Sequence, residues 1–415
     1  MQGKALPGFR DFYPEDLTLR NHIFATWRSV AQRYGFEEYD GPPLESLDLY
    51  TQKSGDEIVS QLYSFKDKGD RDVALRPEMT PTLARMVAAR VQALKKPIRW
   101  FSIPQLFRYE RQQRGRLKEH FQLNMDIIGE AGFLADAELM AAAVDIMRAL
   151  GLGAGDVKLR VSDRRLINAL LTTRGLTEGQ LPAAYAVIDR SERVPRQVLE
   201  EMLRDAKFGK KESSAVFEVA ALRGTDALAQ GGQSAEHLTG AVRALEAMGL
   251  GDFVSIDLTI VRGLAYYTGI VWELFDASKS LRAIAGGGRY DSLLDLPALG
   301  FGMGDVVLGE LLKERGAVSK ASSELGAFLI AVGGDDLATV LQLAHALRDR
   351  GISVEYGLRH AGVRKQLELA SARGAARAVI VGPEERAEGL AVVRDLRTST
   401  EAKVPIRQLL NGYFD

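Results

Sequence analysis

The stretch from Phe107 to Gly129, FRYERQQRGRLKEHFQLNMDIIG, constrains the fold of this chain more than any other. It reads as two strands joined by a short loop, and side chains alternate between the two faces of a strand. On the first strand, predicted over Phe107–Arg111, Arg108 and Glu110 share a face. The second strand has an apolar face and a polar face, formed respectively by Phe121, Leu123, Met125 and Ile127 and by His120, Gln122, Asn124 and Asp126.

Two interpretations of the polar face are open. The simpler one is a surface hairpin with its polar side in water. The functional one makes the polar face the floor of a binding site, with the loop holding phosphate groups, because planar guanidinium groups donate paired hydrogen bonds to phosphate oxygens. The loop is dense in positive charge and contains Arg111, Arg114, Arg116 and Lys118.

Composition limits the class of protein. The 415 residues, 46% hydrophobic and 26% charged, predict two or three globular domains. The absence of cysteine excludes disulfides, thiolate nucleophiles and cysteine zinc sites, and it fits a cytoplasmic location. The polar, proline-broken N-terminus does not read as a signal peptide, and no stretch reaches the roughly 20 apolar residues of a membrane span. A net charge of −1 excludes nucleic-acid binding by global charge alone, although not by a local basic surface.

The body of the chain changes character along its length. A helix is expected after Thr80, read as an N-cap with Pro81 at the first helical position, and another over Leu134–Leu150. Residues 165–248 are rich in Ala, Leu, Glu and Arg and predict a helical insertion. Strand alternation returns at Phe253–Val261.

The C-terminal part predicts a separate small domain. A Ser/Lys/Ala stretch, Ser319–Glu324, reads as a linker. Beyond it, strands such as FLIAV, SVEY and AVIVG alternate with helices, the first of them over about Asp335–Arg350. This alternation favours an α/β domain with a mostly parallel sheet. We therefore expect a body over residues 1–320 and an α/β tail over residues 325–415.

The hairpin closely resembles motif 2 of class II aminoacyl-tRNA synthetases, and specifically of the histidyl-tRNA synthetases. The resemblance implies that Arg108 grips the α-phosphate of ATP, that Glu110 helps to place the adenine, and that Arg116 lies along the triphosphate. His120 would stack on the base, a place where most class II enzymes have phenylalanine.

The run LRPEMT, which ends at Thr80, resembles the LRPEGT signature of the same family. For Thr80 alone, a plain turn and helix cap is the simpler interpretation. The resemblance implies that Glu78 and Thr80 belong to the histidine site and that Glu78 binds the α-amino group, since a carboxylate and a small cation relieve each other's desolvation. Met79 replaces the usual glycine. From motif 2, Gln122 and Asp126 would line the same histidine pocket.

The run VRGLAYYTG, residues 261–269, resembles the RGLxYY signature of histidyl-tRNA synthetases and their close paralogues. Taken alone, an arginine after a strand is usually a surface residue, and paired tyrosines usually belong to a core. The resemblance implies that Arg262 is catalytic and faces the α-phosphate from the side opposite Arg108. Two such cations would stabilise the charge that develops during in-line attack. Tyr266 and Tyr267 would close on the imidazole of the substrate.

One element departs from the family pattern. AGGGRYD, residues 285–291, resembles the family's AGGRYD element, and GFGMGDVVL, residues 300–308, occupies the place of motif 3. The common form of motif 3 ends in Glu-Arg-Leu, and its arginine sandwiches the adenine. Val307 stands at that place, so the third contact to ATP is unaccounted for.

The ends of the chain also fit the resemblance. LPGFRD matches the family's opening, and YDGPPLE matches motif 1, which builds the dimer interface of class II enzymes. The tail resembles their anticodon-binding domain. Its candidate RNA contacts are Arg359, His360, Arg364, Lys365 and Arg373.

The resemblance as a whole implies an α+β fold: an antiparallel class II catalytic sheet with a helical insertion, plus a C-terminal α/β anticodon-binding domain. It implies a homodimeric ligase that uses ATP with Mg²⁺ to activate L-histidine and transfers it to tRNA(His), with no tightly bound cofactor, no metal held by the protein alone and no membrane partner.

Two alternatives remain at this point. One is a regulatory paralogue that supports ATP phosphoribosyltransferase and binds histidine without activating it. Val307 is compatible with that reading, whereas Arg108, Glu110, Arg262 and the tail domain, which such subunits typically lack, favour the synthetase. The other is an RNA-binding or signalling protein on an inactive synthetase body, which would leave the ATP-site residues unexplained.

Overall fold

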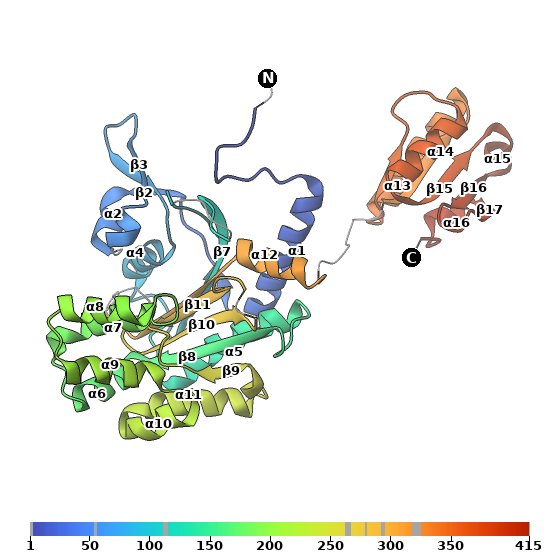
Figure 1. The fold of residues 1–415 in the computed structure, drawn as a ribbon. Coiled ribbons are helices and arrows are strands. Elements are labelled where there is room, and N and C mark those ends of the chain that lie inside the picture. The colour runs from blue at the N-terminus through green and yellow to red at the C-terminus, as the bar shows by residue number, and fades with distance from the viewer. Residues whose placement is uncertain are drawn as a thin grey trace. The chain divides into compact units, whose positions relative to one another are not determined.

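The chain forms two compact units, Met1–Ser319 and Lys320–Asp415, each of which is described here by itself (Figure 1). The computed structural model describes residues 3–53, 56–110, 115–261, 267–278, 280–291, 295–317 and 325–414. The stretch predicted as a linker, Ser319–Glu324, lies outside these ranges. None of the described helices is both long and apolar enough to span a membrane.

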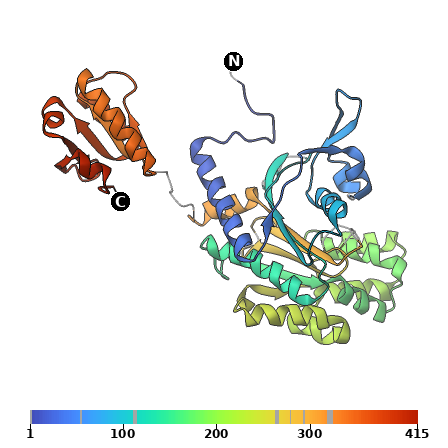
Figure 2. The same cartoon turned by 180° about the vertical axis from the view of Figure 1, so that it is seen from behind.

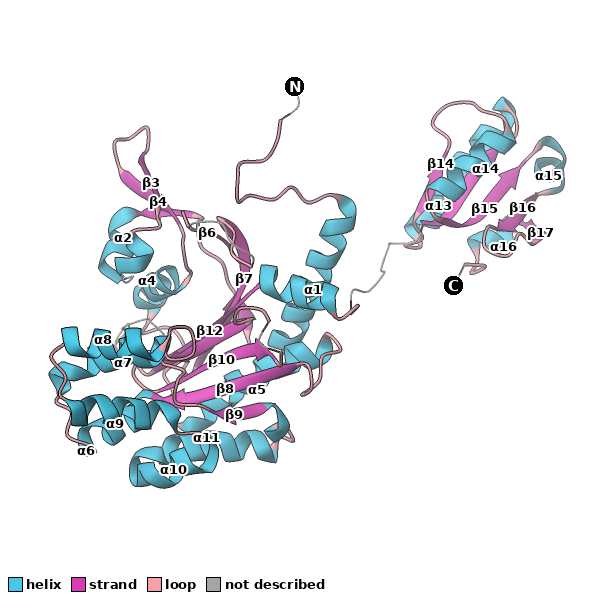
Figure 3. Ribbon diagram, viewed as in Figure 1, coloured by secondary structure: helices cyan, strands magenta, loops and turns pink. Residues whose placement is uncertain are grey.

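A large, mainly antiparallel sheet organises the first unit, as Figure 3 shows. In the described residues it has nine strands in the order β1-β5-β7-β12-β11-β10-β8-β9, with β6 paired to β7. Only the pairs β1–β5 and β8–β9 are parallel. The strands are β1 (Glu37–Glu38), β5 (Ile98–Ser102), β6 (Gln105–Phe107), β7 (Glu119–Ile128), β8 (Val157–Asp163), β9 (Val254–Ile256), β10 (Ile270–Asp276), β11 (Ala285–Arg289) and β12 (Ala298–Gly304). The predicted antiparallel sheet is confirmed.

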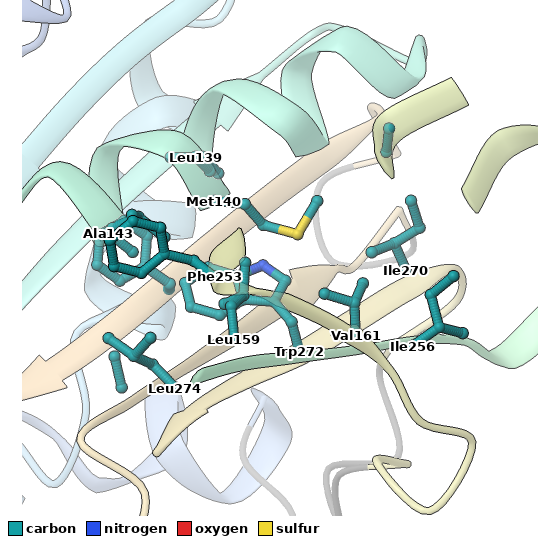
Figure 4. Packing of buried hydrophobic residues seen from close by; sticks show 14 of the residues in the cluster. Leu139, Met140, Ala143, Leu159, Val161, Phe253, Ile256, Ile270, Trp272 and Leu274 are labelled. Atoms are coloured by element: carbon teal, nitrogen blue, oxygen red, sulfur yellow. The ribbon is translucent and has the colours of Figure 1, made fainter. Parts of the chain in front are cut away.

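Helices bury one face of this sheet. In the opposite view, α1 (Pro14–Arg33) and α5 (Phe133–Ala149) lie along the sheet, and α12 (Asp305–Glu314) follows β12 directly (Figure 2). Met140 of α5 packs over Leu159 of β8 and Trp272 of β10 (Figure 4). The predicted helix over Leu134–Leu150 is confirmed to within a residue at each end.

A smaller sheet stands beside the large one and carries the run LRPEMT. It consists of β2 (Leu44–Ser46), β4 (Asp72–Leu75) and β3 (Tyr63–Lys66), with α2 (Leu47–Lys53), α3 (Asp56–Val59) and α4 (Thr80–Arg90) nearby. Thr80 is the first residue of α4 and Met79 is the N-cap, so the prediction that Thr80 caps the helix is wrong by one residue. Proline still fits at the second helical position, where its missing N–H costs nothing.

The predicted helical insertion is confirmed. Between β8 and β9, the described residues form helices and no strand: α6 (Arg164–Thr173), α7 (Leu181–Arg190), α8 (Arg196–Asp205), α9 (Lys210–Ala221), α10 (Gly224–Gly231), α11 (Glu236–Ala247) and short 3₁₀ turns. Helix α11 packs on α5.

The strand predicted over Phe253–Val261 is shorter than expected, because β9 ends at Ile256. Asp257 turns the chain there. Its Oδ1 accepts hydrogen bonds from the backbone N–H and the hydroxyl of Thr259, at 3.0 and 2.7 Å. Such local side-chain bonds offer the backbone an alternative to a strand ladder, which alternation of apolar residues does not reveal.

The same carboxylate fastens the insertion to the sheet. Arg160 of β8 donates through Nε to Oδ2 of Asp257 at 2.7 Å and through its two Nη atoms to Glu192, which follows α7, at 2.9 and 2.7 Å. Arg223, which precedes α10, lies 3.1 Å from Asp257. Arg160 and Asp257 are 5% and 4% exposed, so each of the two ion pairs that hold the insertion has one buried partner.

The second unit is an α/β domain with a mixed sheet in the order β14-β13-β15-β16-β17. The strands β14, β13 and β15 are parallel, whereas β16 and β17 add an antiparallel hairpin, so "mostly parallel" describes only the first three. The elements are β13 (Leu325–Ala331), α13 (Leu337–Asp349), β14 (Val354–Tyr356), α14 (Val363–Ala372), β15 (Ala375–Val381), α15 (Pro383–Glu388), β16 (Leu390–Asp395), β17 (Glu401–Pro405) and α16 (Ile406–Leu410).

The buried contact between Arg160 and Asp257 leads to a stability prediction. Asp257→Ala should lower the free energy of unfolding by about 3 kcal/mol, because it leaves a buried guanidinium without its closest partner. Amides of α7 to α10 should exchange faster with deuterium. Glu192→Gln is the matched control and should cost about 1 kcal/mol, since Glu192 is 40% exposed. Equal losses in the two variants would contradict the role assigned to Asp257.

Candidate functional site

A cavity of about 870 Å³ opens on the face of the large sheet that carries the polar side chains of β7. Nine of the residues predicted from the sequence line it together: Glu78, Thr80, Arg108, Glu110, Arg116, His120, Gln122, Asp126 and Tyr267. The remaining two, Arg262 and Tyr266, lie outside the described residues. The simpler interpretation, a solvated surface hairpin, is therefore wrong for β7.

Strand β7 separates the cavity from the core. Its apolar side chains Leu123, Met125 and Ile127 are at most 1% exposed and belong to the main core cluster. Asn124 also lines the cavity, and its Oδ1 accepts a 2.8 Å hydrogen bond from Nε2 of Gln122. The predicted alternation is thus confirmed along the strand.

Glycines on the neighbouring strand β12 make room for the polar side chains of β7. A Cβ at Gly300 would overlap the carboxylate of Asp126, and one at Gly302 would lie 2.5 Å from Nε2 of Gln122. Both side chains therefore lie over β12. The glycines are required by close approach here rather than by a turn.

Asp126 is a strongly perturbed carboxylate of the cavity. It is 5% exposed, and burial raises its pKa to about 7. The hydroxyl of Tyr290 donates a short hydrogen bond to its Oδ1, which opposes that rise only in part. Tyr290 is a site residue that the sequence analysis missed. It belongs to the run AGGGRYD, one residue beyond β11, and reaches the cavity.

Arg108, Glu110 and Arg116 form a charged cluster at the start of β7. Arg116 donates from Nη2 to Glu110 at 2.8 Å, and Nε of Arg108 donates to the carbonyl of Pro77 at 2.9 Å. The first strand of the hairpin was predicted over Phe107–Arg111, but β6 ends at Phe107. The backbone N–H of Arg108 still pairs with Lys118, whereas that of Tyr109 turns to Gln61, so the alternation argument does not hold there. Arg111 and Arg114 lie outside the described residues.

His120 lies next to this cluster as a neutral ring. Burial, with the charge of Arg108 as the second cause, lowers its pKa to about 3. An uncharged imidazole adds no further positive charge at neutral pH and leaves the ring face available for stacking.

The run LRPEMT is fixed by its arginine. Arg76, 5% exposed, donates to Asp40 and to the carbonyl of Gly41, both at 2.7 Å, and to the carbonyl of Gln105 at 3.0 Å. These bonds hold Glu78, 7% exposed, at the cavity. Met79 is 1% exposed, so the residue that replaces the family's glycine is packed inside the protein.

The insertion reaches the cavity as well, which the sequence did not indicate. Asp189, Glu192 and Arg193, around the end of α7, line it together with Arg160. The ionic contact of Arg160 with Glu192 therefore sets where the insertion meets the site.

The raised pKa of Asp126 leads to a prediction about pH. The folded state keeps this proton up to about pH 7, whereas the unfolded chain loses it near 3.8, so ionisation destabilises the fold as the pH rises between those values. Asp126→Asn removes this effect, so its melting temperature relative to the unsubstituted protein should rise from pH 4.5 to pH 8 in calorimetry. Asp205→Asn, at an exposed position, is the control. A difference that is constant with pH would refute the assignment.

The chain is similar to known proteins over nearly its whole length. The family model described as Histidyl-tRNA synthetase matches residues 8–304, and the one described as Anticodon binding domain matches residues 327–412. The chain is 44% identical to "Histidine--tRNA ligase" of Opitutus terrae, covering 98% of this chain and 97% of that protein. It is 37% identical to the protein of the same description from Thermoplasma volcanium, covering 99% and 98%. A chloroplastic/mitochondrial relative from Arabidopsis thaliana is 38% identical, covering 97% and 85%.

Solved structures share the fold. The crystal structure of histidyl-tRNA synthetase from Nostoc sp. PCC 7120 superposes with a TM-score of 0.84 over 99% of each chain, at 22% identity. The apo S. aureus histidyl-tRNA synthetase gives a TM-score of 0.76 over 100% of both chains, also at 22% identity. At this identity the likeness concerns the fold alone.

Proposed function

Since the chain belongs to the histidyl-tRNA synthetase family, we propose that its cavity performs both steps of a histidine–tRNA ligase. Its substrates are L-histidine, ATP and tRNA(His). In the first step histidine and ATP give histidyl-adenylate and pyrophosphate, and in the second the histidyl group passes to the tRNA.

The observation that carries this proposal is the arrangement of β7 along one continuous cavity. His120 and Asp126 both face the cavity and are separated by about 20 Å along the strand. The cations Arg108 and Arg116 lie next to His120. Asp126 is itself a buried carboxylate and is hydrogen-bonded to the phenol of Tyr290. A polar floor of this length matches an extended ligand with a phosphate-bearing end and a small polar end.

We assign the nucleotide to the end with Arg108, Glu110, Arg116 and His120. A histidine carboxylate oxygen attacks the α-phosphorus of ATP, a new P–O bond forms, and the bond to the bridging oxygen of pyrophosphate breaks. Arg108 and Arg262 would flank that phosphorus and stabilise the charge on its oxygens. A hydroxyl of the terminal ribose of the tRNA then attacks the histidyl carbonyl, and AMP leaves.

We assign the imidazole of the substrate to the other end. Asp126 would accept a hydrogen bond from a ring N–H, with Gln122, Tyr266 and Tyr267 around the ring, while Glu78 and Thr80 hold the α-amino end. An amino acid without the matching nitrogens would leave the buried carboxylate without the hydrogen bond that a ring N–H donates, which costs more than an imperfect apolar fit. Selection by such a pocket does not need a separate editing site.

Mg²⁺ would enter with ATP. Among the residues that the structure describes, no three metal-ligating side chains gather into a cage. This fits an ion that keeps much of its water and is held mainly through the phosphates of its substrate. Here the protein's own part is to orient the triphosphate through Arg116.

The remaining assignments concern partners and location. The second unit would bind the anticodon end of tRNA(His), for which Arg359, Arg364 and Lys365 are exposed. The run YDGPPLE would contribute to a homodimer interface, as it does in class II enzymes. We place the protein in the cytoplasm.

ATP–pyrophosphate exchange with each of the twenty amino acids, one at a time, is the direct test of this function. Histidine alone should support exchange, and charging of tRNA(His) transcript should follow. If histidine bound in calorimetry without supporting exchange, the proposal would fail and the regulatory reading would replace it.

Arg262 carries the mechanistic part of the proposal. Arg262→Ala should reduce the exchange rate by about 10²- to 10³-fold, as the loss of one transition-state donor does. Its melting temperature should not change. Arg148→Ala, on the surface of α5, is the control for a lost arginine. It should catalyse ATP–pyrophosphate exchange at the rate of the unsubstituted protein. Near-normal activity of Arg262→Ala would refute the assigned role.

A further inference from the structure

The nucleotide end of the cavity has a neutral side chain where the family's motif 3 has an arginine. Val307, in the first turn of α12, lines the cavity and is 8% exposed. It belongs to the main core cluster and brings no charge to the nucleotide. A different residue must therefore cover the part of the adenine that the motif 3 arginine covers in other members.

Arg282 approaches Val307 from another element. It lies on the loop between β10 and β11, lines the cavity and is exposed. Gly115, in the basic loop of the hairpin, lies near both side chains. A Cβ placed on Gly115 would lie 3.2 Å from Cγ2 of Val307 and 4.0 Å from Cδ of Arg282. The stem of Arg282 thus passes through the region beside Val307.

The described residues of the loop that carries Arg282 are anchored by hydrogen bonds on both sides of it. Asp276, at the end of β10 and 1% exposed, accepts hydrogen bonds from the backbone N–H groups of Ser280 and Leu281, both at 3.0 Å, and from the hydroxyl of Ser278. On the other side, the N–H of Ile284 donates to Leu274 at 2.7 Å. Arg282 is therefore held between two anchored points, so its stem enters the cavity from a fixed origin.

The small side chains around this point fit an arginine that comes from the loop. Gly115 has a φ of +72°, and its missing Cβ keeps the space beside Val307 open. A longer side chain at position 307 would extend into the same space as the stem of Arg282. Valine on the helix and arginine on the loop are therefore compatible, whereas two arginines would compete for one place and repel each other.

We propose that Arg282 binds ATP and takes the part of the missing motif 3 arginine, with its guanidinium plane against the adenine ring that His120 also contacts. This inference rests on the proposed function, since it assumes that the nucleotide end of the cavity holds ATP. A guanidinium is suited to the task because it is planar, always charged, and stacks on aromatic faces.

The test is to measure the KM for ATP and the KM for histidine separately, in the ATP–pyrophosphate exchange reaction of the full chain. Arg282→Ala should raise the KM for ATP by about tenfold, within the range of a cation–aromatic contact, and leave the KM for histidine within about twofold. Arg282→Lys should be intermediate, because lysine keeps the charge and loses the plane. Binding of a non-hydrolysable ATP analogue, measured by calorimetry without histidine, should weaken by the same factor as the KM rises.

Two controls separate this inference from its alternatives. Arg204→Ala removes an exposed arginine of the insertion and should change neither constant. The melting temperatures of the Arg282 variants, measured alongside, separate a loss of stability from a loss of ATP binding. An unchanged KM and analogue affinity in Arg282→Ala would overturn the inference, and so would equal losses for ATP and histidine. Failure of the proposed function would appear differently, as no exchange by the unsubstituted protein.

Discussion

The two faces of β7 are the constraint on which the rest of the first unit depends. Because side chains alternate strictly along a strand, Leu123, Met125 and Ile127 commit one face to the core under α1 and α5, and every residue between them is committed to the cavity. A slip of one residue would expose the apolar set and bury the polar one, so the core fixes the register of the site. The glycines of β12 belong to the same constraint. With side chains at Gly300 and Gly302, the neighbouring strand would occupy the space in which Asp126 and Gln122 lie.

The floor of the cavity has a cost in stability that follows from its function. Asp126 is buried, and that burial favours its neutral form although the phenol of Tyr290 donates a hydrogen bond to it. In the proposed pocket, an N–H group of the substrate's imidazole would donate a further hydrogen bond to this carboxylate, so the cost of burying it would contribute to selectivity. The opposite end is arranged differently. Glu110 pairs with Arg116 and so reduces the repulsion between the cations of this cluster. In the proposed complex, the phosphates of ATP would provide the negative charge instead of Glu110. In the proposed complex, the imidazole end of the ligand would thus supply a hydrogen-bond donor to Asp126. The phosphate end would supply negative charge to Arg108 and Arg116.

The sequence predicted the features that follow from period and local chemistry. Alternation on β7, the helices flanking it, the helical insertion and the α/β tail were all predicted correctly, and nine site residues meet in one cavity. Several failures come from individual side-chain and backbone bonds that the periodicity of the sequence does not reveal. β9 ends at Ile256 because Asp257 bonds to Thr259 and to Arg160, almost a hundred residues earlier. The first strand of the hairpin ends early because the backbone N–H of Tyr109 pairs with Gln61, whereas that of Arg108 still pairs with Lys118. Tyr290 was visible in the sequence, yet only the short bond to Asp126 shows what it does.

Val307 shows that a residue missing from a sequence motif does not imply that the corresponding group is missing from the cavity. A motif records which residue type occupies a position along the chain, whereas a ligand responds only to which group occupies a position in space. The cavity is lined by residues of several segments between Ile58 of α3 and Val307 of α12, the insertion included, so a guanidinium can reach the nucleotide from any of several backbones. Once Arg282 occupies the space beside Gly115, a small residue at 307 is what packing and charge both favour, and the helix gains a core contact instead. On this proposal, the departure from the motif changes only the element that carries the arginine, which is the loop between β10 and β11 and not α12. The contact between a guanidinium and the adenine is the same.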